Sequence, residues 1–256
     1  MPLSKMPGWV ILPITLPAFT ITGMWIVVYN HTCDTLNDGT CCTLDHIPLV
    51  SKCGNLPPES CFFSLICSLG SFMVMVIGLL RYAFVIERYG PSLLNTVAFV
   101  LGWICAAGLT MVGNFQVDHA KVLHYIGAGV AFPTSMMFIC FQSILTYRMA
   151  HTYWNWWAGH VRCLLTLFGL VILVLSGVFF IQEGFVLQHL AALFEWTFII
   201  NVLVYYGTFA FEFGAITTDT FLVLLKASRA PKSYKSGTST PATPHAHSTS
   251  ENLAMI

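Results

Sequence analysis

The sequence carries little charge. Only 9% of its 256 residues are Asp, Glu, Lys or Arg, whereas 56% are hydrophobic. A soluble domain carries about 25% charged residues, so this composition excludes an ordinary soluble protein and indicates an integral membrane protein. The 11 basic and 11 acidic residues leave no net charge, and we expect no nucleic-acid partner.

The sequence also lacks the motifs of common enzyme classes. It contains no glycine-rich phosphate loop, no H-E-x-x-H and no nucleophile elbow. His119 and His124 stand five residues apart across a helix start, which is a poor spacing for a metal site. We therefore expect a protein that is not an enzyme, with no catalytic residues, no metal and no cofactor.

Long apolar runs dominate instead. Each is close to the roughly 20 residues that a helix needs to cross the hydrocarbon core, and the predicted spans are residues 9–29, 62–80, 94–112, 122–145, 163–181 and 190–213. No A-x-A cleavage pattern follows the first run, so we expect an uncleaved helix rather than a signal peptide. The predicted fold is an all-α bundle of six transmembrane helices, with one disulfide-bearing outer loop and a disordered cytoplasmic tail.

The cations sort to one side of these spans. If the chain crosses six times, nine of its 11 Lys and Arg residues share a side: Lys5, Arg81, Arg88, Arg148, Arg162, Lys226, Arg229, Lys232 and Lys235. Only Lys52 and Lys121 fall opposite. The positive-inside rule then places residues 1–8 and 214–256 in the cytoplasm and residues 30–61 outside.

The outer loop holds five of the nine cysteines, namely Cys33, Cys41, Cys42, Cys53 and Cys61. An oxidising compartment favours disulfides among them, with at least one cysteine left over because the number is odd. A zinc site with His31 and His46 is the less favoured alternative, since the spacing matches no zinc pattern. The loop begins with the sequon Asn30-His31-Thr32, which makes Asn30 a candidate glycosylation site.

The tail, residues 214–256, becomes rich in Ser, Thr, Pro and Lys after a short apolar stretch. Such a composition cannot bury a core, so we expect disorder. Its cations are candidates for contact with anionic lipid or a partner, although positive-inside topology alone would also explain them. These cations are Lys226, Arg229, Lys232 and Lys235.

Polar residues within the spans are few. Asn114, Gln116, His124 and Glu195 fall near the outer interface by the predicted topology, while Glu212 lies at the inner end of the last span. The outer group is either a site for an ion or a headgroup, or a network of hydrogen bonds between helices. We favour the network, because no cation lies at mid-membrane and no span is broken in matched halves.

Several strings of the sequence resemble one family. They include PLVSKCGNLPPESCFFS at residues 48–64, VGNFQVDHAKVLHYIGAGVAFP at residues 112–133, LFEW at residues 193–196 and YGTFAFEF at residues 206–213. With these strings the chain resembles the DRAM/Sfk superfamily of six-span proteins, and within it the A-type branch of the transmembrane protein 150 family. The resemblance extends over nearly the whole chain.

The resemblance implies a regulator. Members of the A-type branch are associated with delivery of a phosphatidylinositol 4-kinase and its adaptor complex to the plasma membrane. The expected function is thus a multi-pass plasma-membrane adaptor that controls phosphatidylinositol 4-phosphate synthesis, with the lipid bilayer and the kinase complex as partners. Two alternatives stay open: a modulator of autophagy in endosomal or lysosomal membranes, and an ion channel or channel subunit.

Overall fold

The computed structural model describes residues 8–30, 47–150, 153–182 and 184–229. Within these ranges every regular element is helical, and none is a strand. The elements are η2 (Gly8–Val10), α1 (Ile11–Asn30), α2 (Glu59–Tyr89), α3 (Leu93–Asn114), α4 (Lys121–Arg148), α5 (Tyr153–Phe180), α6 (Phe185–Gly207), α7 (Ala210–Phe213) and α8 (Thr218–Arg229). In the described part of the chain, six segments are long and apolar enough to cross a membrane, which confirms the prediction of an all-helical protein with six candidate spans.

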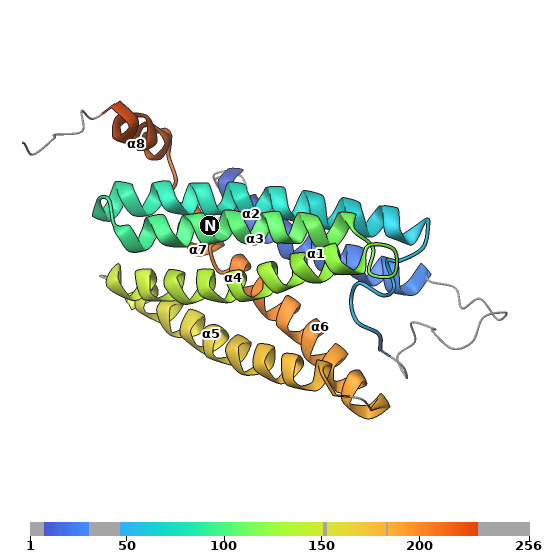
Figure 1. Ribbon diagram of the computed structural model, residues 1–256. Helices are drawn as coiled ribbons and strands as arrows, with labels where there is room; N and C mark the ends of the chain where they lie inside the picture. The colour runs from blue at the N-terminus through green and yellow to red at the C-terminus, as the bar shows by residue number, and fades with distance from the viewer. Residues whose placement is uncertain (1–7, 31–46, 151–152, 183, 230–256) are drawn as a thin grey trace, which may run out of the picture.

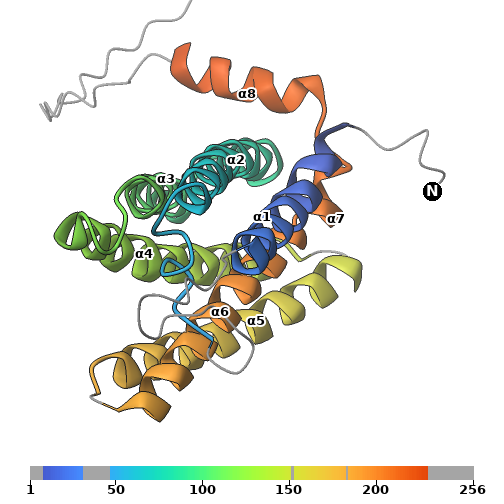
Figure 2. The same ribbon diagram turned by 90° about the vertical axis from the view of Figure 1, so that its right-hand side faces the viewer.

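The six long helices form a closed ring of neighbours. Each packs against the next along the chain, α6 returns to α1, and α4 also contacts α6 (Figure 1, Figure 2). Helices joined by short connections become antiparallel neighbours, which is the expected order for a bundle with short loops. The side chains that face the centre of this ring form the interior of the bundle.

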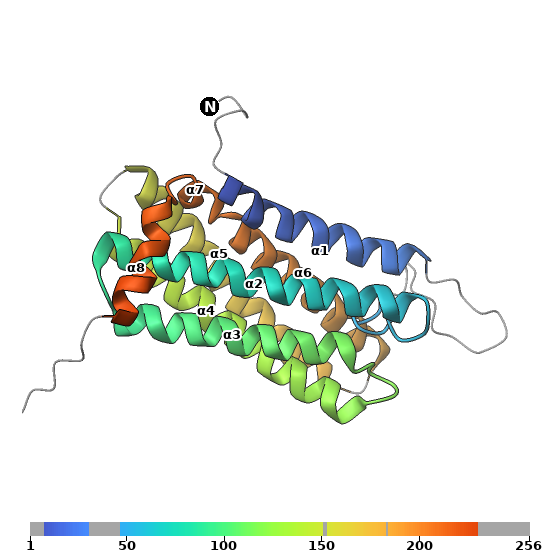
Figure 3. The same cartoon turned by 90° about the horizontal axis from the view of Figure 1, so that it is seen from above.

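The two ends of the bundle differ. One end, here called the inner end, holds the start of α1, the α2–α3 turn, the α4–α5 connection, α7 and α8 (Figure 3). The opposite, outer end holds residues 47–58 and the α3–α4 connection. The sequence predicts that the inner end faces the cytoplasm.

Gly90 ends α2 at the inner end. Its φ of 79° lies in the left-handed region that favours glycine, and its N–H donates to Ile86 O at 2.9 Å. Pro91 follows, and the chain re-enters a helix at Leu93. This short turn makes α2 and α3 antiparallel neighbours.

Glycines bring α3 and α4 close together. A methyl group added at Gly108 would lie 2.8 Å from Ala131 N and 2.9 Å from Gly127 O. Only a residue without a side chain fits such a backbone approach, which is how small residues permit tight helix packing in membranes. This contact fixes α4, which supplies two of the polar side chains described below.

The apolar core closes towards the inner end with aromatic rings. Phe138 of α4 stacks on Tyr206 of α6 with centroids 5.4 Å apart, and Phe209 meets the same tyrosine at 5.9 Å. All three rings are fully buried or nearly so. They form the inner part of the apolar core, and Phe209 adjoins the charged groups at the inner end.

Part of the predicted disordered tail is instead helix α8. This helix lies across the bundle at its inner end and packs against α2 (Figure 2). The ring of Phe221 lies 5.0 Å from that of Trp9, and Thr220 Oγ1 donates to Glu87 Oε2 at 2.7 Å. The apolar run at the start of the tail gains enough contact here to order residues 218–229, so the expectation of disorder was wrong for them. Residues 230–256 lie outside the described residues.

Candidate functional site: a buried arginine and glutamate cluster

Two arginines and one glutamate meet inside the bundle at its inner end. Arg81 of α2 and Arg162 of α5 are both fully buried, and the side chain of Glu212 in α7 is 10% exposed. Arg81 Nη1 donates to Glu212 Oε2, while Arg162 Nη1 lies 2.9 Å from Glu212 Oε1 and its Nη2 3.3 Å from Oε2. One carboxylate therefore links two guanidinium groups from different helices.

Neutral side chains complete the cluster. Gln142 Oε1 accepts from Arg81 Nε at 3.1 Å, and Thr208 Oγ1 accepts from Arg162 Nε at 2.9 Å. Thr146 Oγ1 accepts from both arginines, at 3.3 Å from Arg81 and 2.6 Å from Arg162. Since these groups come from α2, α4, α5 and the segment 208–213 that follows α6, the cluster ties four parts of the bundle together.

The ring of Phe209 adjoins both guanidinium groups. The central carbon is 5.3 Å from the ring centroid for Arg81 and 4.6 Å for Arg162. Cations over an aromatic face gain about 2 kcal/mol when they are removed from water. The ring thus offsets part of the cost of burying these arginines.

The sequence prediction had placed these two arginines outside the spans. Instead, α2 continues to Tyr89 and α5 begins at Tyr153, so at 1.5 Å per residue Arg81 lies about 12 Å and Arg162 about 14 Å from those helix ends. They are bundle residues and not loop residues, which lowers the nine inner cations used for topology to seven. Seven against two still gives the same predicted orientation.

A signal for the cluster was present in the sequence. Glu212 is an acid at the end of an apolar span, and an acid in that position calls for a cationic partner. If the arginines are interpreted only as markers of the cytoplasmic side, Glu212 has no cationic partner. The ion pairs could have been inferred by asking which cations adjoin the inner ends of the other spans.

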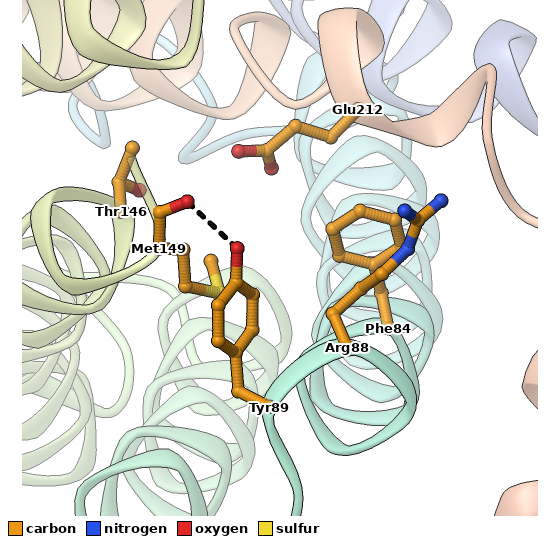
Figure 4. A pocket seen from close by; sticks show the side chains of 6 residues that line it. All are labelled: Phe84, Arg88, Tyr89, Thr146, Met149 and Glu212. Carbon is orange, nitrogen blue, oxygen red and sulfur yellow. Dashed lines mark hydrogen bonds between the residues drawn. The ribbon is translucent and has the colours of Figure 1, made fainter. Parts of the chain in front are cut away.

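A small pocket of about 60 Å³ adjoins the cluster. It is lined by Phe84, Arg88, Tyr89, Thr146, Met149 and Glu212 (Figure 4). The Glu212 carboxylate and the Arg88 side chain approach it from different helices, and Tyr89 Oη closes one side by donating to Met149 O at 2.7 Å. The pocket therefore gives access to two members of the cluster, Thr146 and Glu212.

The polar residues predicted near the outer interface have separate partners. Asn114 bonds to Ser64 at 2.8 Å and to Ser68 at 3.2 Å, which joins α3 to α2. His124 Nδ1 bonds to Phe115 O at 2.6 Å and closes the α3–α4 connection. Gln116 lies in that connection, where its carbonyl accepts from Ala120 N at 2.9 Å.

Glu195 contacts the outer loop rather than a neighbouring helix. Its carboxylate accepts a hydrogen bond from the backbone of Val50, and the neighbouring Trp196 Nε1 donates to Pro48 O at 3.0 Å. These two side chains of α6 hold the described part of the outer loop. None of the hydrogen bonds above joins Glu195 to Asn114 or His124, so the four predicted residues form several contacts rather than one cluster.

The outer loop is only partly described. Cys53 is fully buried and disulfide-bonded, whereas Cys61 carries an exposed free thiol. Residues 33, 41 and 42, the other predicted disulfide cysteines, lie outside the described residues, as do residues 31 and 32 of the sequon; Asn30 is the last residue of α1.

Of the four predicted tail contacts, Lys226 and Arg229 belong to α8, while Lys232 and Lys235 lie outside the described residues. Among the residues that the structure describes, no group of three or more His, Cys, Asp or Glu side chains is arranged to hold a metal ion. The arginine and glutamate cluster is thus the site that we consider for function.

Comparison with known proteins shows which family this chain belongs to. The sequence model of the family "Frag1/DRAM/Sfk1/Cwh43P N-terminal domain" matches residues 8–216, a range that contains the whole arginine and glutamate cluster. Transmembrane protein 150A of Xenopus laevis is 52% identical over 98% of this chain and its own full length, and the human protein of that name is 45% identical over the same shares. A "Modulator of macroautophagy" from Xenopus tropicalis is 29% identical over 84% of this chain and 91% of its own, and no solved structure matches. The chain therefore belongs to the Frag1/DRAM/Sfk1 family of membrane proteins, and within it is more similar to transmembrane protein 150A than to the macroautophagy modulators.

Proposed function

We propose that this chain is a non-enzymatic adaptor of the plasma membrane that controls where a phosphatidylinositol 4-kinase complex acts. The observation that carries the proposal is similarity over the whole chain to transmembrane protein 150A, at 45–52% identity. The family resemblance of the sequence implies this role for that branch. The names of the compared relatives contain no enzymatic activity.

The inner end supplies a surface suited to such an adaptor. Helix α8 packs on α2 there through Phe221 and Thr220, so the last described segment is held against the bundle. Leu222 and Leu225 are exposed on this helix, at 41% and 54%. A helix with exposed apolar side chains at the predicted cytoplasmic interface can lie on the inner leaflet, where a peripheral kinase complex works.

Truncation of the tail tests this function. Removal of residues 230–256 keeps every helix that the structure describes, α8 (Thr218–Arg229) included. We expect normal surface abundance but slower recovery of plasma-membrane phosphatidylinositol 4-phosphate after depletion, followed with a fluorescent lipid reporter. The matched variant replaces Lys232 and Lys235 with Gln in the full chain, and should show a smaller delay if contact with the partner is partly electrostatic.

Two results would count against the adaptor role. Unchanged recovery in the truncated chain, at equal surface level, would remove residues 230–256 from the mechanism. Unchanged recovery in cells that lack both this chain and its paralogues would remove the kinase proposal itself. Proximity labelling from the C-terminus gives an independent measurement, because an adaptor should label the kinase complex.

Modulation of autophagy is the second candidate function. It is favoured by the relatives named modulators of macroautophagy, which are 28–30% identical over 82–84% of this chain. Steady residence in lysosomal membranes and altered autophagic flux, with normal recovery of phosphatidylinositol 4-phosphate, would support this function over the first. Reproducible currents from purified protein in liposomes would instead favour a channel.

A further inference from the structure

The buried cluster carries more positive than negative charge. Arg81 and Arg162 contribute two positive charges and Glu212 one negative charge, so the formal sum is +1. Both guanidinium groups are fully buried. An uncompensated charge in a protein interior is costly unless other groups satisfy it. An anion at this place would balance the sum.

The two buried arginines differ in how many of their N–H groups donate a hydrogen bond. A guanidinium has five N–H groups. Arg162 uses all five, on Thr208 Oγ1, Thr208 O, Thr146 and the two oxygens of Glu212. Arg81 uses three, on Gln142, Thr146 and Glu212. Two N–H groups of Arg81 therefore have no hydrogen-bond partner among the described residues.

The pocket is lined by two hydrogen-bond partners of Arg81, although not by Arg81 itself, and it carries a third arginine. Thr146 and Glu212, which line it, are direct partners of Arg81. Arg88 lines it as well, on the exposed side, with its guanidinium 5.4 Å from the ring centroid of Phe84 (Figure 4). Counting Arg88, the groups in and behind the pocket sum to +2, even though the Glu212 carboxylate contributes to the lining. The nearby carboxylate of Glu87 accepts from Thr220 and does not line the pocket.

We propose that this pocket binds a phosphate group, presented by an anionic lipid headgroup of the adjoining leaflet or as free phosphate. Arg88 makes the direct contact at the entrance, and Arg81, behind the lining, supplies buried positive charge. Guanidinium groups match phosphate oxygens in geometry and form strong charge-assisted hydrogen bonds with them. The pocket is at the inner end, where a headgroup can enter from the predicted cytoplasmic leaflet.

Two exposed arginines at the same end give a matched test. Arg88 lines the pocket, whereas Arg148, in the last turn of α4, does not. The parent chain, Arg88→Gln and Arg148→Gln are purified in detergent and titrated with phosphatidic acid, phosphatidylserine or phosphatidylcholine, and lipid adducts are counted by native mass spectrometry. Both variants lose one exposed charge, so general attraction to anionic lipid falls equally. Arg88→Gln should weaken phosphatidic acid binding about tenfold more than Arg148→Gln does, because it alone loses a charge-assisted contact in the pocket.

Inorganic phosphate separates the two sources of the ligand. If it displaces phosphatidic acid from the parent chain, the site accepts free phosphate; if only lipids bind, the headgroup is the ligand, and both results support the pocket. Equal weakening in the two variants would assign binding to surface charge and overturn the proposal, as would an absence of phosphatidic acid adducts on the parent chain. Binding is measured on the purified chain, so the result is independent of the kinase proposal.

Discussion

Neutralising Glu212 should destabilise the bundle more than neutralising any surface acid. Glu212→Gln keeps the size of the side chain but raises the buried formal charge from +1 to +2, because both guanidinium groups bond to this one carboxylate. Breaking a buried ion pair by removing one partner typically costs 3–5 kcal/mol. Since Glu212 is 10% exposed and both arginines keep neutral acceptors, we expect about 3 kcal/mol, the lower end of that range.

The measurement is thermal unfolding of a fluorescently tagged chain in detergent, followed by size-exclusion chromatography. For a chain of this size, about 3 kcal/mol corresponds to a fall in Tm on the order of 10 °C. Asp219→Asn is the control, since Asp219 is an exposed acid of α8 at the same end of the bundle. Its Tm should stay within about 1 °C of the parent, as for most exposed substitutions.

A double variant tests whether charge imbalance is the cause. Arg81→Gln combined with Glu212→Gln returns the buried formal charge to +1, so the loss of stability in the double variant should be smaller than the sum of the two single losses, by about 1–3 kcal/mol of coupling. If the two single losses simply add in the double variant, the loss comes from packing and the electrostatic account is wrong. A Tm of Glu212→Gln equal to that of the control would refute it as well.

Three further predictions concern the outer end and the topology. With both termini in the cytoplasm, protease added outside intact cells should leave a tag after Ile256 in place, and loss of the tag would overturn the seven-to-two cation argument. Glu195→Ala should lower surface abundance, because the Val50 N–H loses its acceptor and the outer loop keeps only the Trp196 contact with Pro48 of the two described above. Normal abundance with lost lipid recovery would instead make Glu195 a functional residue. Without reductant, a thiol reagent should label Cys61 and not Cys53 in the mature protein, which the mass of the intact labelled protein would measure. Labelling of both cysteines would contradict a disulfide at Cys53.

The spans were predictable from the sequence because helix length and apolar composition are local properties. Each predicted span coincides with helix in the described residues, except that the last, 190–213, is divided into α6, which ends at Gly207, and α7, which begins at Ala210. The continuation of α2 from the predicted end at residue 80 to Tyr89 was missed, because a rule that ends a span at its first charge cannot see that Arg81 is paired. A charged residue marks the end of a span only if its side chain is in water. The partner that keeps Arg81 inside the bundle is Glu212, which lies 131 positions away in the sequence.

The same reason explains why α8 and the outer contacts escaped prediction. The apolar stretch before the tail is too short to order by itself, and it does so only because Trp9 and Glu87 offer a ring and an acceptor. Glu195 was identified as an intramembrane acid, but its partner is the backbone of Val50, which carries no sequence signal. What the sequence leaves undetermined is therefore the pairing of its few polar groups. In a bundle that is otherwise apolar, those pairings decide where four helices meet, so the most informative residues for function are the rare charged ones with no exposure to water.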